Sequence, residues 1–177
     1  MFFSVIGHYS LILGLFFGLI LIYFSIKNFS NFETLNSRIL SFTFLQFFFV
    51  IISFLCLVLS FVLSDFSNET VYNNSHTTKP LFYKIAGTWG NHEGSLLLWL
   101  FVLTLFILIF LIKTKNQPLR YRILTLVFQE IIIIGFFIFL IKTSNPFNYL
   151  YPTPGEGLGL NPILQDPALA IHPPILY

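Results

Sequence analysis

The sequence predicts an all-α integral membrane protein with four transmembrane helices, the start of a fifth and long loops at one outer face. Of its 177 residues, 56% are hydrophobic and 9% are charged, and the mean hydropathy is +0.84. A soluble domain carries about 25% charged residues, so this composition could not cover a water-exposed surface. Four windows are also long and apolar enough to cross a membrane, and polar segments separate them.

The predicted spans cover residues 5–26, 39–63, 95–112 and 123–141, and a fifth begins after residue 170. A hydrocarbon core is about 30 Å thick, which about 20 helical residues cross. Each span must be helical because lipid offers no partner to backbone N–H and C=O groups. Gly14 and Gly18 lie four residues apart in the first span, a spacing that permits a close helix contact.

The distribution of basic residues predicts the orientation. The loops after the first and third spans hold six of them: Lys27, Arg38, Lys113, Lys115, Arg120 and Arg122. The opposite side holds three, which are Lys79, Lys84 and Lys142. The more basic side should face the cytoplasm or matrix. The N-terminus and the segments 64–94 and 142–170 then face outward, towards the periplasm or intermembrane space.

Composition also limits the partners and the compartment. A net charge of +2 gives no reason to expect a nucleic-acid partner. The single cysteine, Cys56, excludes a disulfide framework. Twenty-four Phe, with abundant Ile, Leu, Asn and Tyr, indicate AT-rich codons, and the N-terminus lacks a presequence pattern. The expected location is the mitochondrial inner membrane, with synthesis inside the organelle, or a bacterial inner membrane.

Glu130 is an unusual residue in the fourth predicted span. It lies eight residues beyond Arg122, about 12 Å into the membrane at 1.5 Å per residue. Intramembrane carboxylates often mark ion paths or paired sites. Alternatively, Glu130, beside Gln129, faces another helix and is neutral or hydrogen-bonded there.

The entry to the third span carries a first suggestive motif. A polar loop at 65–79 and an amphipathic stretch at 81–86 precede it. Trp89 and Trp99 then bracket the membrane interface, and Asn91 can cap a helix on which His92 shares a face with Trp99. His92 is either a packing residue at headgroup level or part of a site.

The second motif surrounds His172. Asp166 and Pro167 can start a helix, and the double proline Pro173-Pro174 is expected to break or restart it directly after His172. A histidine held between these constraints loses few conformations on ligation, and imidazole suits haem iron. The residues alone leave a metal or haem ligand as one of several possibilities.

Three segments together resemble the N-terminal part of the CcmF family, the large haem-handling subunit of the cytochrome c maturation system. They read TWGNHEGSLLLW at 88–99, TSNPF at 143–147, and NPILQDP at 161–167 followed by HPPILY at 172–177. Their order and spacing are those of the family, and the resemblance covers essentially the whole chain.

The resemblance implies that residues 1–177 form the N-terminal transmembrane part of a haem lyase. Such a protein receives haem b from a haem chaperone and helps to attach its vinyl groups to apocytochrome c. It implies that His172 is an axial ligand to the haem iron at the outer face. Trp89, His92 and Trp99 are expected to be either further residues of that haem site or packing residues.

The family's second outer axial histidine and its Trp-rich segment should follow the His-Pro-Pro motif, and this sequence does not contain them. The expectation is therefore a fragment or one part of a split protein. Such a part belongs to a holocytochrome c synthase complex but is not competent alone. The haem site would be shared with the rest of CcmF or with other maturation subunits.

Three alternatives stay open at this stage. One is a hydrophobic respiratory-complex or transporter subunit, which would bury ionisable residues along a path. Another is a related haem lyase that serves a different c-type cytochrome. The third is an assembly protein that carries no haem ligand.

Overall fold

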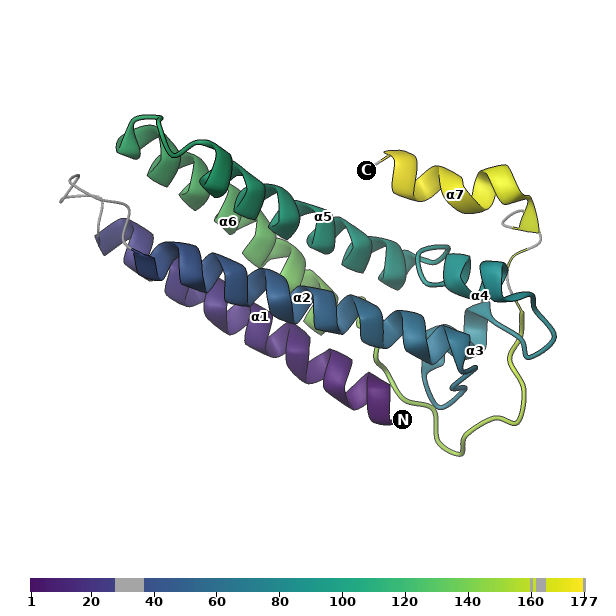
Figure 1. Cartoon of the computed structure of the whole chain (residues 1–177). Helices are drawn as coiled ribbons and strands as arrows, with labels where there is room; N and C mark the ends of the chain where they lie inside the picture. The colour runs from purple at the N-terminus through teal and green to yellow at the C-terminus, as the bar shows by residue number, and fades with distance from the viewer. Residues whose placement is uncertain (28–36, 160, 162–164, 177) are drawn as a thin grey trace.

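A computed structural model of the chain describes residues 1–27, 37–159, 161 and 165–176 (Figure 1). The helices are α1 (Phe2–Lys27), α2 (Ser37–Val62), α3 (Glu69–Asn74), α4 (Leu81–Gly87), α5 (His92–Lys113), α6 (Leu119–Lys142) and α7 (Pro167–Leu176). Four of them, with 26, 26, 22 and 24 residues, are long and apolar enough to cross a membrane. The described residues form no strand, so the predicted all-α membrane fold with four spans is confirmed.

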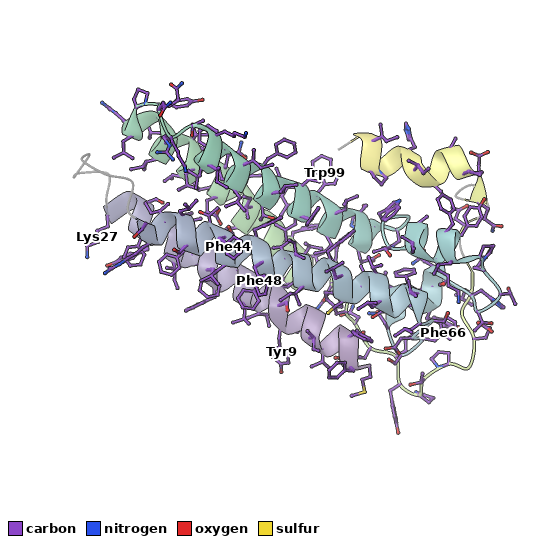
Figure 2. The ribbon with its side chains drawn as sticks, viewed as in Figure 1. Tyr9, Lys27, Phe44, Phe48, Phe66 and Trp99 are labelled. Carbon is purple, nitrogen blue, oxygen red and sulfur yellow. The ribbon has the colours of Figure 1, made fainter. Side chains whose placement is uncertain are left out.

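The four long helices form one bundle. α1 packs against α2 and α6, α2 packs against α5, and α5 packs against α6. Large apolar side chains also cover the outside of the bundle, among them Tyr9, Phe44 and Phe48, which are 61%, 55% and 45% exposed (Figure 2). An outer surface of this kind is suited to lipid rather than to water.

Glycines of α1 allow the close packing at the centre of the bundle. A Cβ on Gly14 would lie 2.8 Å from the ring of Phe137 on α6. A Cβ on Gly18 would lie 2.5 Å from Glu130 Oε1 and 2.6 Å from Gln46 Nε2. The close helix contact predicted from these two glycines is therefore present, and α2 and α6 make it with α1.

Glu130 lies inside the bundle and is fully buried. The fully buried Gln46 of α2 donates a hydrogen bond from Nε2 to Glu130 Oε1 at 2.5 Å. Of the two interpretations of Glu130, the structure supports the hydrogen-bonded contact with another helix. The contacts among Gly18, Gln46 and Glu130 align α1, α2 and α6 along the bundle.

Arg122 belongs to α6 rather than to the loop in which the sequence placed it. It is only 6% exposed, and its guanidinium donates to the carbonyl of Leu111 at 2.6 Å and to Thr114 Oγ1 at 3.2 Å. The last carbonyls of a helix have no partner within the helix, so Arg122 caps the C-terminal end of α5.

At the end of the bundle that holds the N-terminus, residues 64–91 and 143–159 form a layer that we call the platform (Figure 1). The polar loop predicted at 65–79 is partly wrong, because Asn68 caps the short helix α3. Buried Asn68 also donates to Ser4 Oγ at 3.1 Å and to the carbonyl of Pro146 at 2.9 Å. One amide therefore joins α1 to both segments of the platform.

α7 begins at Pro167, as predicted, but continues through Pro173 and Pro174 to Leu176. The break predicted after His172 is therefore wrong. α7 contacts α4, which belongs to the platform. With ten residues it is too short to cross a membrane, and the fifth span stays a prediction.

Candidate functional site

Asn91 shapes the turn that leads from α4 into α5. Its Oδ1 accepts a hydrogen bond from the Gly94 amide at 2.7 Å, and its Nδ2 donates to the carbonyl of Gly87 at 2.7 Å. The predicted cap is thus present, and α5 begins at His92. A Cβ on Gly94 would lie 1.6 Å from the Thr88 carbonyl oxygen, so this tight turn requires glycine.

Trp89 connects this turn to α7. Its indole N–H donates to the carbonyl of Ala170 at 2.8 Å, and Ala170 is 2% exposed. In a regular helix that carbonyl would accept from the amide of residue 174, or from residue 173 in a tighter turn. Both are prolines and have no N–H to donate. Trp89 therefore supplies the hydrogen-bond donor that the double proline removes.

The contact between Trp89 and Ala170 explains why the helix continues past His172. An unpaired buried carbonyl costs about 1–3 kcal/mol, which would favour a break at this point. The indole satisfies it, and the two motifs singled out in the sequence are thereby joined. His172 lies two residues beyond Ala170 on the same short helix, and its side chain is exposed.

His92 and Trp99 pack against α6. The His92 and Phe139 rings meet edge-to-face with their centroids 6.3 Å apart. The Trp99 ring stacks on the Phe136 ring with a centroid distance of 5.9 Å. Both side chains are nevertheless exposed, and Trp99 is 42% exposed (Figure 2). Of the three accompanying residues, Trp89 reaches α7, whereas His92 and Trp99 line the neighbouring face of α5 and α6.

The segment that leads to α7 is fastened to the platform. The backbone amides of Leu158 and Gly159 donate to the carbonyls of Tyr72 and Ser75 at 2.8 and 3.0 Å. Glu156 accepts hydrogen bonds from the hydroxyl and the amide of Thr77, at 2.6 and 3.0 Å. These bonds lower the pKa of Glu156 to about 2.

The donor set fits a haem ligand better than a metal cluster. In the part of the chain that the structure describes, no three His, Cys, Asp or Glu residues gather closely enough to hold a metal ion. Haem iron takes one or two axial ligands and is otherwise held by the porphyrin. An exposed imidazole on an anchored helix meets that requirement for one of them.

The sequence motifs predict the four candidate residues but not the contacts that hold them. The prolines at 173 and 174 were a usable signal, because they leave the Ala170 carbonyl without its helical donor. The pair of Thr77 and Glu156 gives no such signal, since 79 residues separate the partners.

A family model described as cytochrome c assembly protein matches residues 89–177, which include the Trp89 turn and α7. The chain belongs to the cytochrome c assembly protein family. It is 51% identical over 128 residues to the cytochrome c-type biogenesis protein CycK of Rhizobium meliloti, covering 72% of this chain and 19% of that protein. It is 46% identical over 176 residues to CycK of Bradyrhizobium diazoefficiens, covering 97% and 26%.

The cytochrome c-type biogenesis protein CcmF of Escherichia coli is 44% identical over 126 residues, which cover 71% of this chain and 20% of that protein. A solved structure, the cytochrome c heme lyase CcmF, matches with a TM-score of 0.71 at 25% identity over 85% of this chain and 25% of its own. The chain is therefore a CcmF-like membrane protein, as the sequence motifs indicated. It spans between about a fifth and a quarter of the length of these relatives.

Proposed function

We propose that this chain is part of a cytochrome c maturation haem lyase and holds haem b at the outer membrane face through His172. The family and the CcmF-like fold support the role in cytochrome c maturation. The observation that carries the assignment of His172 is the hydrogen bond from Trp89 to Ala170, because it fixes α7 on the platform. The respiratory-complex and transporter alternatives have no comparable support.

The chain acts by positioning haem, which is here a substrate. In thioether formation a cysteine thiol adds across a haem vinyl group, so that a C–S bond forms, the C=C double bond becomes single, and the thiol proton ends on carbon. His172 would hold the iron, and the platform would fix the orientation in which the vinyl groups meet the thiols. Trp89 positions α7, while His92 and Trp99 present a ring edge and an apolar surface nearby.

The partners follow from this incomplete site. One imidazole of this chain would share the haem with a second axial ligand from the remaining part of a CcmF-like protein or from another maturation subunit. A haem chaperone would deliver haem, apocytochrome c would accept it, and the chain would act together with these partners. The outer side would be the intermembrane space or the periplasm, which labelling of single cysteines at Thr153 and Asn116 in a Cys56→Ser background would test.

A ligand substitution tests the central assignment. The chain is co-expressed with the part of the Bradyrhizobium diazoefficiens relative that lies beyond the matched region, and haem in the purified complex is quantified. His172→Ala should lower the haem content at least about tenfold, the effect of losing about 1.4 kcal/mol of binding. His172→Met should retain haem and shift its absorption spectrum, since the axial ligand changes.

Two controls make the test specific. Asn73→Ala changes an exposed residue of the platform and should leave haem content and spectrum unchanged. His92→Ala should act more weakly than His172→Ala, through its contact with Phe139. Full haem content and normal cytochrome c maturation in His172→Ala would refute the assignment.

A further inference from the structure

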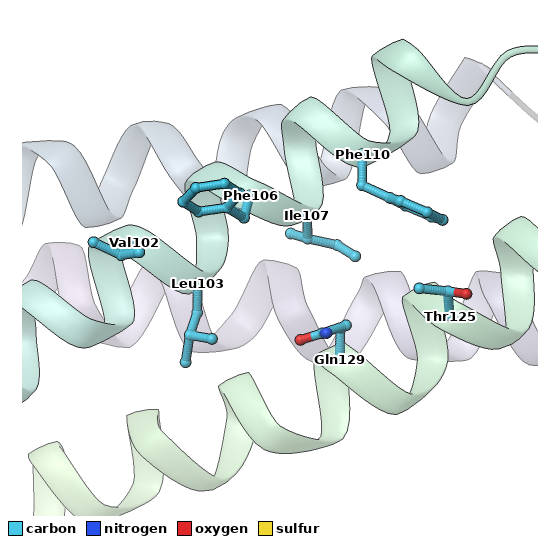
Figure 3. Close-up of a pocket in the computed structure, with 7 residues that line it drawn as sticks. All are labelled: Val102, Leu103, Phe106, Ile107, Phe110, Thr125 and Gln129. Carbon is cyan, nitrogen blue, oxygen red and sulfur yellow. The ribbon is translucent and has the colours of Figure 1, made fainter. Parts of the chain in front are cut away.

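The side of α5 and α6 that faces away from α1 and α2 carries a groove with two hollows. One, of about 410 Å³, is lined by Leu96, Ile132, Gly135, Phe136 and Phe139. The other, of about 380 Å³, is lined by Val102, Leu103, Phe106, Ile107, Phe110, Thr125 and Gln129 (Figure 3). We call these residues the α5–α6 groove.

Polar groups open into this groove at the depth of the hydrocarbon core. Gln129 lies ten residues into the 24-residue helix α6, and Thr125 lies one turn before it. Both side chains reach into the space between α5 and α6 (Figure 3). Neither makes a side-chain hydrogen bond to a residue that the structure describes. Lipid tails offer the Gln129 amide no partner, and leaving it unpaired there is unfavourable.

The same surface leaves room for another backbone. A Cβ on Gly135 would meet no atom within 4 Å, in contrast to Gly14 and Gly18, whose space α6 and α2 already occupy. Phe106, which lines the same hollow as Gln129, is 62% exposed. A small residue beside a shallow apolar groove permits a close approach between helices in a membrane.

We infer that the α5–α6 groove is the docking surface for a further transmembrane helix, which carries a hydrogen-bonding side chain at the depth of Gln129. The helix would come from the three-quarters of the family protein that these 177 residues do not span, because the chain covers 26% of the Bradyrhizobium diazoefficiens relative. A lipid chain fills apolar space but leaves the amide unpaired, so it accounts for the hollows and not for Gln129. This inference rests on the family and not on the role of His172.

Photocrosslinking tests the occupant. A benzoyl-phenylalanine replaces Phe106 in the chain, co-expressed with the tagged remaining part of the Bradyrhizobium diazoefficiens relative. Irradiation in membranes should link position 106 to that part, at an apolar segment that mass spectrometry locates. The same probe at Phe16, which is 53% exposed on α1 and lines neither hollow of the groove, is the matched control and should give a much weaker link to that segment.

Two variants test the chemistry. Gln129→Leu should lower the yield of the link at position 106 about threefold, the typical effect of one interhelical hydrogen bond in a membrane. Gly135→Leu should lower it further by filling the approach. Both variants should keep the helix content of the chain, since neither residue packs inside the bundle, and haem bound through His172 is measured separately.

Three results would overturn the inference. A link at position 106 to lipid alone would mean that the groove is a lipid surface. A product with twice the 20.5 kDa mass of the chain would mean that a second copy fills it. Equal crosslink yields at position 106 in the chain with Gln129 and in Gln129→Leu would show that Gln129 makes no hydrogen bond to the docked helix.

Discussion

The two faces of α6 differ in how far other helices of this chain cover them. On the closed face, Leu126, Glu130, Ile133, Phe137 and Leu140 are all fully buried. On the open face, Thr125, Gln129 and Phe136 are half-buried, and Ile132 and Gly135 are exposed. Gln129 and Glu130 are neighbours in the sequence, yet Glu130 has an amide partner on α2 and the Gln129 amide has none among the described residues.

The difference shows which surfaces of the bundle already have their partner. Where a membrane helix has found its neighbour, small residues such as Gly18 are covered and polar side chains meet across the interface. Gln46 and Glu130 share one hydrogen bond there, while Gln46 Oε1 and Glu130 Oε2 have no partner among the described residues. Where a helix face has no such neighbour, residues of the same types remain exposed. The two faces of α6 have similar compositions, because each combines a polar group with large apolar side chains. Composition alone therefore does not distinguish the covered face from the exposed one.

The largest expected effect comes from the glycines. Gly18→Ala places a methyl group 2.5 Å from Glu130 Oε1 and 2.6 Å from Gln46 Nε2. Both side chains are flexible but are fully buried and bonded to each other, so the substitution should destabilise the chain by about 2–3 kcal/mol. Gly135→Ala adds the same group to α6 where nothing lies within 4 Å, and should leave the stability unchanged or slightly higher. The free energy of unfolding in mixed micelles, from the fluorescence of the two tryptophans, compares them. Equal losses would mean that the two faces are equally packed.

The two amides give the second comparison. Gln46→Leu leaves the buried Glu130 carboxyl without its donor and should cost about 1–2 kcal/mol. Gln129→Leu removes an amide with no partner among the described residues and should be neutral for the chain alone. The free energy of unfolding, measured in the same way, compares the two variants. A cost for Gln129→Leu that matches Gln46→Leu would place a hidden partner on the open face.

A smaller effect is expected at the platform. Trp89→Phe keeps an aromatic ring but removes the pyrrole ring with the N–H that bonds to Ala170, which should weaken the docking of α7 by about 1 kcal/mol. Hydrogen exchange of the α7 amides should rise about fivefold, while the amides of α5 stay protected. Trp99→Phe, which keeps an aromatic contact with Phe136, serves as the control. Unchanged exchange in Trp89→Phe would show that other contacts hold α7.

The smallest effect concerns pH. The pKa of Glu156 is lowered to about 2 because Thr77 donates two hydrogen bonds to the carboxylate. A depressed pKa contributes stability above the unfolded value, near 4.5, and that contribution falls away as the pH drops towards 2. The protection of the Thr77 amide, corrected for intrinsic exchange, should therefore decrease between about pH 4.5 and 2. In Glu156→Gln the protection should not change over this range.

Much of the fold could be predicted because the membrane imposes it. Four apolar windows had to be helices, and the cap at Asn91 and the close approach at Gly14 and Gly18 depend on local chemistry and spacing. The short helix α3 was missed because it depends on Asn68, whose side chain is held by Ser4 and Pro146 from distant parts of the chain.

In the candidate site, too, local sequence predicts some features and distant contacts determine the others. Trp89, His92, Trp99 and His172 were chosen from motifs, but the continuation of α7 through two prolines was not expected. A proline in a helix is unfavourable locally, and here the tertiary hydrogen bond from Trp89 offsets part of that cost. Arg122 was assigned to a loop for a related reason, because charge at a helix end is indistinguishable in sequence from charge in the adjoining turn.

The double proline has a consequence for the order of assembly. Away from Trp89, α7 would contain a carbonyl that no amide of its own can reach, so the isolated segment is a poor helix. Helix formation and docking should therefore occur together, as in a segment that folds on binding. The imidazole of His172 would then reach its position only after the bundle and the turn at Asn91 have formed, and a ligand that it held would bind only from that point on.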